Sequence, residues 1–175
     1  MKLRIVLAAL AIVLTAGCTG VPDGVEVVDD FELERYLGTW YEIARLDHSF
    51  ERGLENVTAN YSLRDDGGVA VLNRGYDVKK GEWDDANGKA YFNDDPTVGR
   101  LKVSFFGPFY AGYNVIELDK EDYSYALVSG PDRDYLWVLA RDPNIDRATV
   151  DALVGKAKDL GYPTDELIWV DHSER

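Results

Sequence analysis

Apolar and polar residues alternate along much of this chain, with the period of two that is typical of β-strands lying against a core. Val57, Ala59 and Tyr61 alternate with polar neighbours, and Leu101 and Val103 repeat the pattern further along the chain. Such segments present one apolar face and one wet face. The pattern therefore predicts half-buried strands packed on a common interior.

Eight segments have this alternating or β-rich character. They span 39–47, 56–64, 69–78, 82–92, 100–106, 110–118, 123–129 and 134–141. Short runs rich in Asp, Gly and Pro, such as 65–68 and 130–131, separate them and are typical of tight turns. A meandering sheet of this size tends to close, because closure removes exposed edges. The pattern predicts an all-β, eight-stranded up-and-down antiparallel barrel, and a two-sheet sandwich is the alternative.

The segments that flank the predicted sheet have helical character. A short helical turn is expected within 29–37. After the last long strand, Val150, Leu153 and Ala157 fall at helical spacing, which predicts an amphipathic helix over 146–160. Gly161 is placed to cap that helix, and a short strand over 167–170 is expected to end the fold.

Composition excludes several partners. The chain has 175 residues and a formal net charge of −13, so it repels nucleic acid and anionic membrane surfaces. Eleven Tyr, four Trp and sixteen Gly favour strands and turns over a helical bundle. Contact with a membrane must therefore come from something other than bulk charge.

The first eighteen residues have the layout of an export signal. Lys2 and Arg4 precede an apolar run over 5–14, which is shorter than the roughly twenty residues that span a bilayer. Small residues follow and end at Cys18, the only cysteine. The segment resembles the lipobox of bacterial lipoproteins, although Thr15 stands where Leu is usual. An ordinary signal peptide with an incidental cysteine is the alternative.

The lipobox resemblance implies a division of the chain. Residues 1–17 would be a cleaved signal peptide, and Cys18 would be acylated, as with palmitate, and become the mature N-terminus. Thr19 follows the cysteine, as in lipoproteins of the outer membrane, so a lipid-anchored domain facing the periplasm is expected. Residues 18–28 are predicted to be a tether, and residues 29–175 are predicted to form one domain.

Three short blocks together resemble the signature of the lipocalin family. They are Gly38 to Trp40, Tyr123 with Ala126, and 141–143, which begins with Arg141. Segments 38–45, 48–54, 103–110 and 130–139 are similar to the bacterial lipocalins that are carried as outer-membrane lipoproteins. The chain departs from the family pattern at 119–123, where the family block is more compact.

The resemblance implies an eight-stranded barrel that holds one small ligand. In an up-and-down barrel, the three blocks fall at the same end of the barrel. The family resemblance implies that Arg141 stacks under Trp40 and closes that end. Gly38, Trp40, Tyr123 and Arg141 are therefore expected to be structural residues of the barrel base.

The inward-facing side chains would line an apolar cavity suited to a fatty acid or a lysophospholipid. The candidate ligand-binding residues are Tyr61, Val103, Phe105, Tyr113, Tyr135, Trp137 and Leu139. Tyr113 is expected near the open end, where it could hydrogen-bond a head group. The alternative is that these side chains fill a solid core. Phe50, Phe106 and Phe109 are expected at the open end, where they either admit an acyl chain, touch a membrane or pack on one another.

The sequence favours a binding protein over an enzyme. The only histidines are His48 and His172, and the chain has neither Gly-x-Ser-x-Gly nor His-Glu-x-x-His. No catalytic residue, metal site or cofactor is predicted. A structural or partner-binding lipoprotein with a filled barrel is the alternative function, and a lipid esterase is disfavoured. The identity of the lipid, its physiological use and dimerisation remain open at this level.

Overall fold

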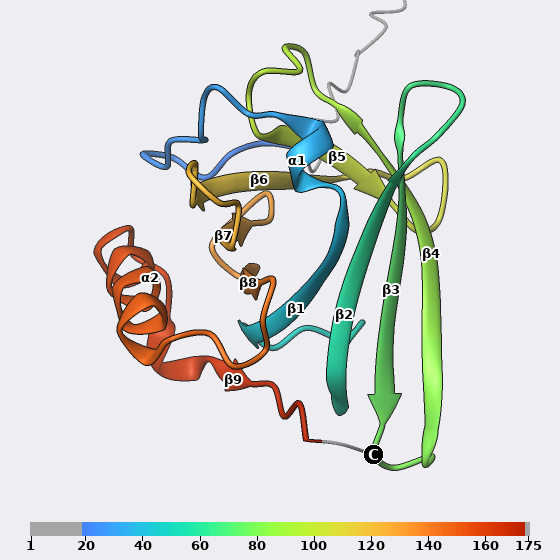
Figure 1. Cartoon of the computed structure of the whole chain (residues 1–175), viewed down its shortest axis with the longest axis vertical. Coiled ribbons are helices and arrows are strands. Elements are labelled where there is room, and N and C mark those ends of the chain that lie inside the picture. The colour runs from blue at the N-terminus through green and yellow to red at the C-terminus, as the bar shows by residue number, and fades with distance from the viewer. Residues whose placement is uncertain (1–18, 174–175) are drawn as a thin grey trace, which may run out of the picture.

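The computed structural model describes residues 19–173, which form one nine-stranded antiparallel sheet (Figure 1). The strands are β1 (Gly38–Arg45), β2 (Leu54–Leu63), β3 (Val69–Asp77), β4 (Glu82–Phe92), β5 (Arg100–Ser104), β6 (Ala111–Leu118), β7 (Tyr125–Ser129), β8 (Leu136–Ala140) and β9 (Ile168–Trp169). The first eight strands begin and end within two residues of their predicted bounds. The predicted signal peptide (residues 1–17) and the predicted lipid-attachment residue Cys18 lie outside the described residues.

The sheet closes into a barrel because β1 pairs with both β2 and β8. Trp40 lies opposite Ala59 of β2, and Tyr41 lies opposite Ala140 of β8. The remaining strands pair with their sequence neighbours in an up-and-down order. The predicted eight-stranded barrel is therefore confirmed, and the two-sheet alternative is wrong.

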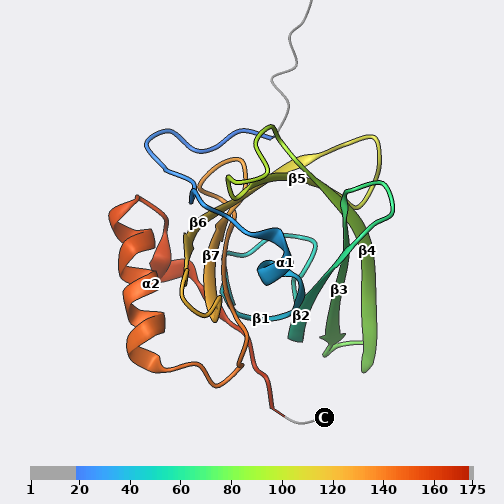
Figure 2. The ribbon, with the colours of Figure 1, turned by 45° about the horizontal axis from the view of Figure 1, so that its top comes forward.

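The two ends of the barrel differ. The connections at 46–53, 78–81, 105–110 and 130–135 gather at one end, which we call the mouth. At the other end, the base, the short helix α1 (Leu33–Tyr36) lies across the opening, as the view along the barrel shows (Figure 2). One end is thus covered by the chain that leads into β1.

Two apolar clusters stabilise the fold. The first fills much of the barrel interior and includes Trp40, Val115 and Val128, all fully buried. The second lies between the outside of the barrel and helix α2 (Arg147–Asp159), where Leu127 and Leu153 are buried. Strands β6–β8 are therefore apolar on both faces, which explains why their sequences alternate less cleanly than that of β2.

Helix α2 follows the prediction closely. Asp146 caps its N-terminus by accepting a hydrogen bond from the Thr149 backbone N–H at 3.0 Å. Gly161 ends it with a φ of +86°, which an L side chain rarely adopts. A 3-10 turn η1 (Thr164–Glu166) leads to β9, which pairs with β1. None of the helices in the described part of the chain is long and apolar enough to cross a membrane.

Arg141 connects the segments that form the base of the barrel. Its guanidinium lies 4.0 Å from the ring centroid of Trp40, and its Nε donates to the Tyr123 carbonyl at 3.3 Å. The other two nitrogens donate to four further carbonyls, those of Arg35, Tyr36, Leu37 and Thr39. Gly38 has a φ of +94°, and a Cβ there would lie 3.4 Å from the guanidinium. The structure thus brings together the four residues assigned to the base.

The connection between β6 and β7 is organised by Asp119. Its carboxylate accepts hydrogen bonds from the backbone N–H groups of Glu121, Asp122 and Ser124. Tyr123 takes a left-handed φ of +54° within this turn. The departure from the family pattern at 119–123 is therefore a carboxylate-stabilised turn, which places Tyr123 under the barrel.

Replacing Arg141 with Ala is expected to lower the free energy of unfolding by about 3 kcal/mol, because several half-buried carbonyls lose their donor and Trp40 loses its stacked cation. Urea unfolding followed by circular dichroism measures the change. Arg147→Ala is the matched control, since Arg147 also lies near an indole, that of Trp169 at 5.7 Å, but is exposed. An equal decrease in the free energy of unfolding in the two variants would contradict a stabilising role for Arg141 at the base.

Candidate ligand-binding cavity

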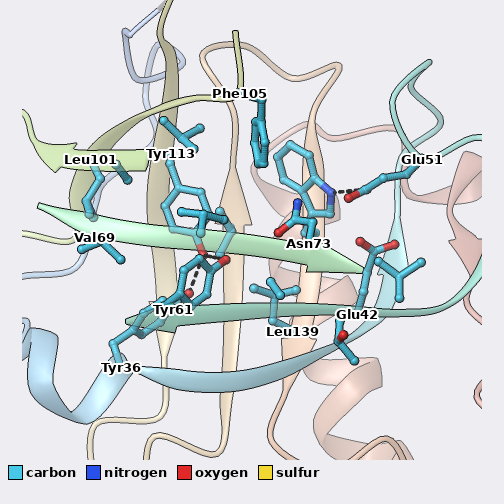
Figure 3. Close-up of a pocket in the computed structure, with 18 of the residues that line it drawn as sticks. Tyr36, Glu42, Glu51, Tyr61, Val69, Asn73, Leu101, Phe105, Tyr113 and Leu139 are labelled. Atoms are coloured by element: carbon cyan, nitrogen blue, oxygen red, sulfur yellow. Dashed lines mark hydrogen bonds between the residues drawn. The ribbon is translucent and has the colours of Figure 1, made fainter. Parts of the chain in front are cut away.

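The barrel encloses a cavity of about 100 Å³ between the base and the mouth (Figure 3). Most of its wall is apolar and comes from β2, β3, β5 and β8. Six of the seven predicted pocket residues line it: Tyr61, Val103, Phe105, Tyr113, Trp137 and Leu139. Tyr135 does not line the cavity, because its ring stacks on the indole of Trp137 beside the Gly130 backbone.

A group of three tyrosines forms the base end of the cavity. The hydroxyl of Tyr113 lies 2.7 Å from that of Tyr36 and 2.9 Å from that of Tyr61. The ring of Tyr36 in turn packs on Trp40, with centroids 4.7 Å apart. Tyr113 therefore reaches toward the base, although its strand begins at the mouth, so its hydroxyl is placed away from a head group at the mouth.

Burial keeps these phenols neutral. Removal from water raises the pKa of Tyr36, of Tyr61 and of Tyr113 above the ordinary value. The three hydroxyls can thus donate and accept hydrogen bonds among themselves at any physiological pH. The base end of the cavity is polar at three points but carries no charge.

A buried charged cluster lies at the mouth end. Arg45 and Glu42, only 1% and 3% exposed, form an ion pair of 2.6 Å. Arg45 also donates through Nη2 to the backbone carbonyls of Glu51 and Leu54, at 2.7 and 3.3 Å. The carboxylate of Glu51 accepts from the Trp137 indole N–H at 3.1 Å. These contacts tie β1, the first mouth loop and β8 together.

His48 completes this cluster. Its Nε2 lies 3.0 Å from Oε2 of Glu51, and its ring meets that of Trp137 edge to face at 5.2 Å. Ser49, its neighbour in sequence, is exposed while His48 is buried. The two side chains therefore point to different environments, which does not fit a Ser–His pair.

The two glutamates of the cluster titrate in opposite directions. Burial raises the pKa of Glu42 well above its ordinary value, and the charge of Glu51 raises it further, while Arg45 offsets only part of this. Burial would also raise the pKa of Glu51, but the contacts with His48 and Trp137 hold it below its ordinary value. The two carboxyl groups therefore differ in their surroundings, because Glu42 is balanced only by Arg45 whereas Glu51 also contacts His48 and Trp137.

The sequence analysis missed this polar cluster. One signal was available, because Glu42 follows Trp40 at the spacing of two that marks the inner face of β1. Glu51 and Arg45 carried no such signal. A β-bulge between Glu42 and Ala44 shifts the register of β1, and Glu51 folds inward from a loop.

The aromatic residues of the mouth loops do not pack on one another. Phe50, Phe106 and Phe109 are 70%, 75% and 78% exposed. Phe50 meets only the ring of His48, at 5.7 Å, among the ring contacts of the described residues. The alternative of a packed loop cluster is therefore wrong, and three apolar rings stand in solvent around the mouth.

Comparison with known proteins identifies relatives over the whole barrel. Residues 31–172 match the family model described as a lipocalin-like domain. The outer membrane lipoprotein Blc of Vibrio cholerae is 56% identical over 168 residues, which cover 96% of this chain and 98% of that protein. Its namesake from Escherichia coli K12 is 56% identical over 170 residues, with 96% of each covered.

More distant proteins share the fold. Rat apolipoprotein D is 34% identical over 132 residues, which cover 71% of this chain and 68% of that protein. Insecticyanin from the tobacco hornworm Manduca sexta superimposes with a TM-score of 0.70 at 22% identity, covering 89% of this chain and 88% of that one. The barrel architecture is thus common to bacterial and animal proteins.

Replacing Arg45 with Met is expected to destabilise the protein by about 3–5 kcal/mol, because a buried charge partner is removed and buried carbonyls are left without a donor. Arg52→Met is the control, since the Arg52–Asp47 pair is exposed and should be worth less than about 1 kcal/mol. Urea unfolding compares the two. A small effect at Arg45 would show that the buried cluster does not hold the mouth loop.

Proposed function

The chain belongs to the lipocalin family, and on that basis we propose that it is an outer-membrane lipoprotein that binds fatty acids or lysophospholipids in its barrel cavity, for storage or transport. The observation that carries the proposal is the cavity itself. It is apolar along most of its length, polar at both ends and enclosed by a complete barrel. An alkyl chain placed there gains about 0.8 kcal/mol for each buried methylene.

The size of the cavity implies that side chains move when ligand enters. Its volume of about 100 Å³ is below the roughly 300–1,000 Å³ of most ligand pockets. Phe105 is half-buried and follows β5 directly at the mouth, and its ring lies over Gly88, where a Cβ would come within 2.8 Å of it. We infer that this ring turns aside to admit a long chain.

The start of the described chain supports a short distance to the membrane. The carbonyl of Thr19 accepts from the Asn93 side chain at 3.2 Å, and that of Gly20 accepts from Asn114 at 3.0 Å. Thr19 and Gly20, which belong to the segment predicted to be a tether or spacer, therefore contact the barrel wall. An acylated Cys18 would precede them directly, so the anchor would hold the barrel close to the lipids that it binds.

A second function is favoured by the small cavity. A barrel whose interior stays filled would serve as a structural or partner-binding lipoprotein, and the exposed phenylalanines of the mouth would be its contact surface, for a second copy of the chain or for another protein. Catalysis is not proposed, because His48 packs against Glu51 and Trp137 while its neighbour Ser49 is exposed to solvent.

Titration with a lysophospholipid is expected to change the fluorescence of Trp137 saturably, because this indole lines the cavity. The measurement uses the Cys18→Ser form without its signal peptide, which keeps every described residue. The change should be lost in Trp137→Phe, whereas Trp83→Phe, at an exposed indole, should retain it. Absence of a response to any long-chain lipid would favour the filled barrel.

Filling the cavity provides an independent test of the site. Val103→Phe is expected to weaken lysophospholipid binding about tenfold or more, because the added ring occupies the space that the chain needs. Lys102→Phe places the same ring on the outer face of the same strand and should leave affinity unchanged. Isothermal titration gives both affinities, and unchanged binding by Val103→Phe would rule out the barrel interior as the site.

A further inference from the structure

We propose that the mouth end of the cavity is a subsite for a primary ammonium head group, so that the preferred lipid carries a protonated amine rather than a free carboxylate. This inference rests on the proposed lipid-binding function and narrows its ligand class. It is based on the charges of the residues that line the cavity. These are negative, whereas a site for a fatty-acid anion is expected to present a positive charge.

The charged residues that line the cavity are both acidic. Glu42 and Glu51 project into its mouth end, and Figure 3 shows them on the same side as Asn73, opposite the tyrosines. Every other lining residue is apolar or neutral. A ligand carboxylate at this end would therefore face two carboxyl groups and no cation.

The nearby cation is already engaged. Arg45 stands behind the cavity wall, and its Nη1 and Nη2 donate to the Glu42 carboxylate and to two backbone carbonyls. His48 lies against Glu51 and does not line the cavity. The Nε atom of Arg45 has no partner among the described residues, but neither Arg45 nor His48 lines the cavity, so neither presents a donor to a ligand there.

An unpaired acceptor marks the same end. The Oδ1 atom of Asn73 is fully buried and has no hydrogen-bond partner among the residues that the structure describes. His48, itself more than nine-tenths buried, also has an Nδ1 atom without a partner in that part of the chain. Buried polar atoms are normally hydrogen-bonded, so the Asn73 oxygen indicates a missing donor.

A primary ammonium supplies what the subsite lacks. It carries one positive charge and three N–H donors, which match the carboxyl groups of Glu42 and Glu51 and the amide oxygen of Asn73. Arg45 contacts the carboxylate of Glu42 but only the backbone carbonyl of Glu51, and burial raises the pKa of Glu42. An ammonium bound between the two carboxyl groups would stabilise the charged form of both.

The other end of the cavity suits the chain of such a lipid. Val57, Ala59 and Leu139 form the apolar wall between the glutamates and the tyrosines. The hydroxyls of Tyr36 and Tyr61 are both hydrogen-bonded to Tyr113, so they do not need a hydrogen-bonding group from the ligand. The polar group of the ligand is therefore directed to the mouth and its alkyl chain to the base.

Three ligands with the same sixteen-carbon chain test the proposal. Hexadecylamine, hexadecanoate and hexadecanol are compared at pH 8, below their aggregation limits, by the Trp137 fluorescence change in the Cys18→Ser form. The amine is expected to bind about tenfold more tightly than the acid, with the alcohol between them, because one charge-assisted contact replaces a repulsive one. A carboxylate that binds as tightly as the amine would overturn the proposal.

Substituting each glutamate in turn tests whether its carboxyl group binds the ammonium. Glu51→Gln and Glu42→Gln are each expected to weaken amine binding about tenfold while hexadecanol affinity changes less than about twofold. Glu82→Gln is the matched control. Glu82 is exposed at the mouth end of β4, so this substitution removes the same charge from outside the cavity. Should Glu42→Gln not fold, Glu51→Gln still provides the test, since its amide retains an acceptor for Trp137.

The outcomes separate this proposal from the proposed function. Equal loss of amine and alcohol affinity in the glutamine variants would overturn the ammonium subsite and leave lipid binding intact. Failure of all three ligands to bind would overturn lipid binding as well. Two hexadecanoyl lysophospholipids, with ethanolamine and with glycerol head groups, then identify the class of amine that binds. Tighter binding of the ethanolamine lipid indicates that the amine belongs to a phospholipid. Equal binding of the two indicates a simple long-chain amine.

Discussion

The contact between Arg141 and Trp40 is the constraint on which the rest of this structure depends. One guanidinium stacks on an indole and donates to carbonyls of α1, of β1 and of the turn before β7. Arg141 lies 102 residues from Thr39 of β1 but only 18 from Tyr123, so its contacts join the beginning and the end of the barrel sequence at the base. A planar group with five donors can do this, whereas a lysine ammonium cannot.

Closure at the base makes the interior a separate environment. Once water is excluded there, the pKa values of Tyr36 and Glu42 rise, and a buried amide oxygen without a partner costs free energy. The polar groups within the barrel are divided between its ends, with neutral tyrosines at the base and the glutamates at the mouth. This division gives the cavity a direction, because an amphiphile has different surroundings at its two ends.

The outer layer fixes the barrel from the other side. Helix α2 covers the wall formed by β6–β8, and Tyr162 beyond it donates to Ser129 at 2.6 Å. Residues 19–28 lie along the neighbouring wall, where Val28 exchanges backbone hydrogen bonds with Val115 and Gly99. The long hairpin of β3 and β4 lies away from α2 (Figure 1).

The sequence alone determined the strands, the outer helix and the residues of the base, because each is encoded by a local period or a short motif. Alternation of Val57, Ala59 and Tyr61 fixes which face of β2 is buried, and Asp146 and Gly161 fix the ends of α2. Tertiary structure decided the chemistry of the cavity. Glu51 reaches it from a loop, Arg45 turns inward after a bulge, and Tyr113 points to the base from a strand that starts at the mouth. The alternation of apolar and polar residues does not predict where these side chains point. Their directions depend on register shifts and loop paths that are set only when the barrel closes.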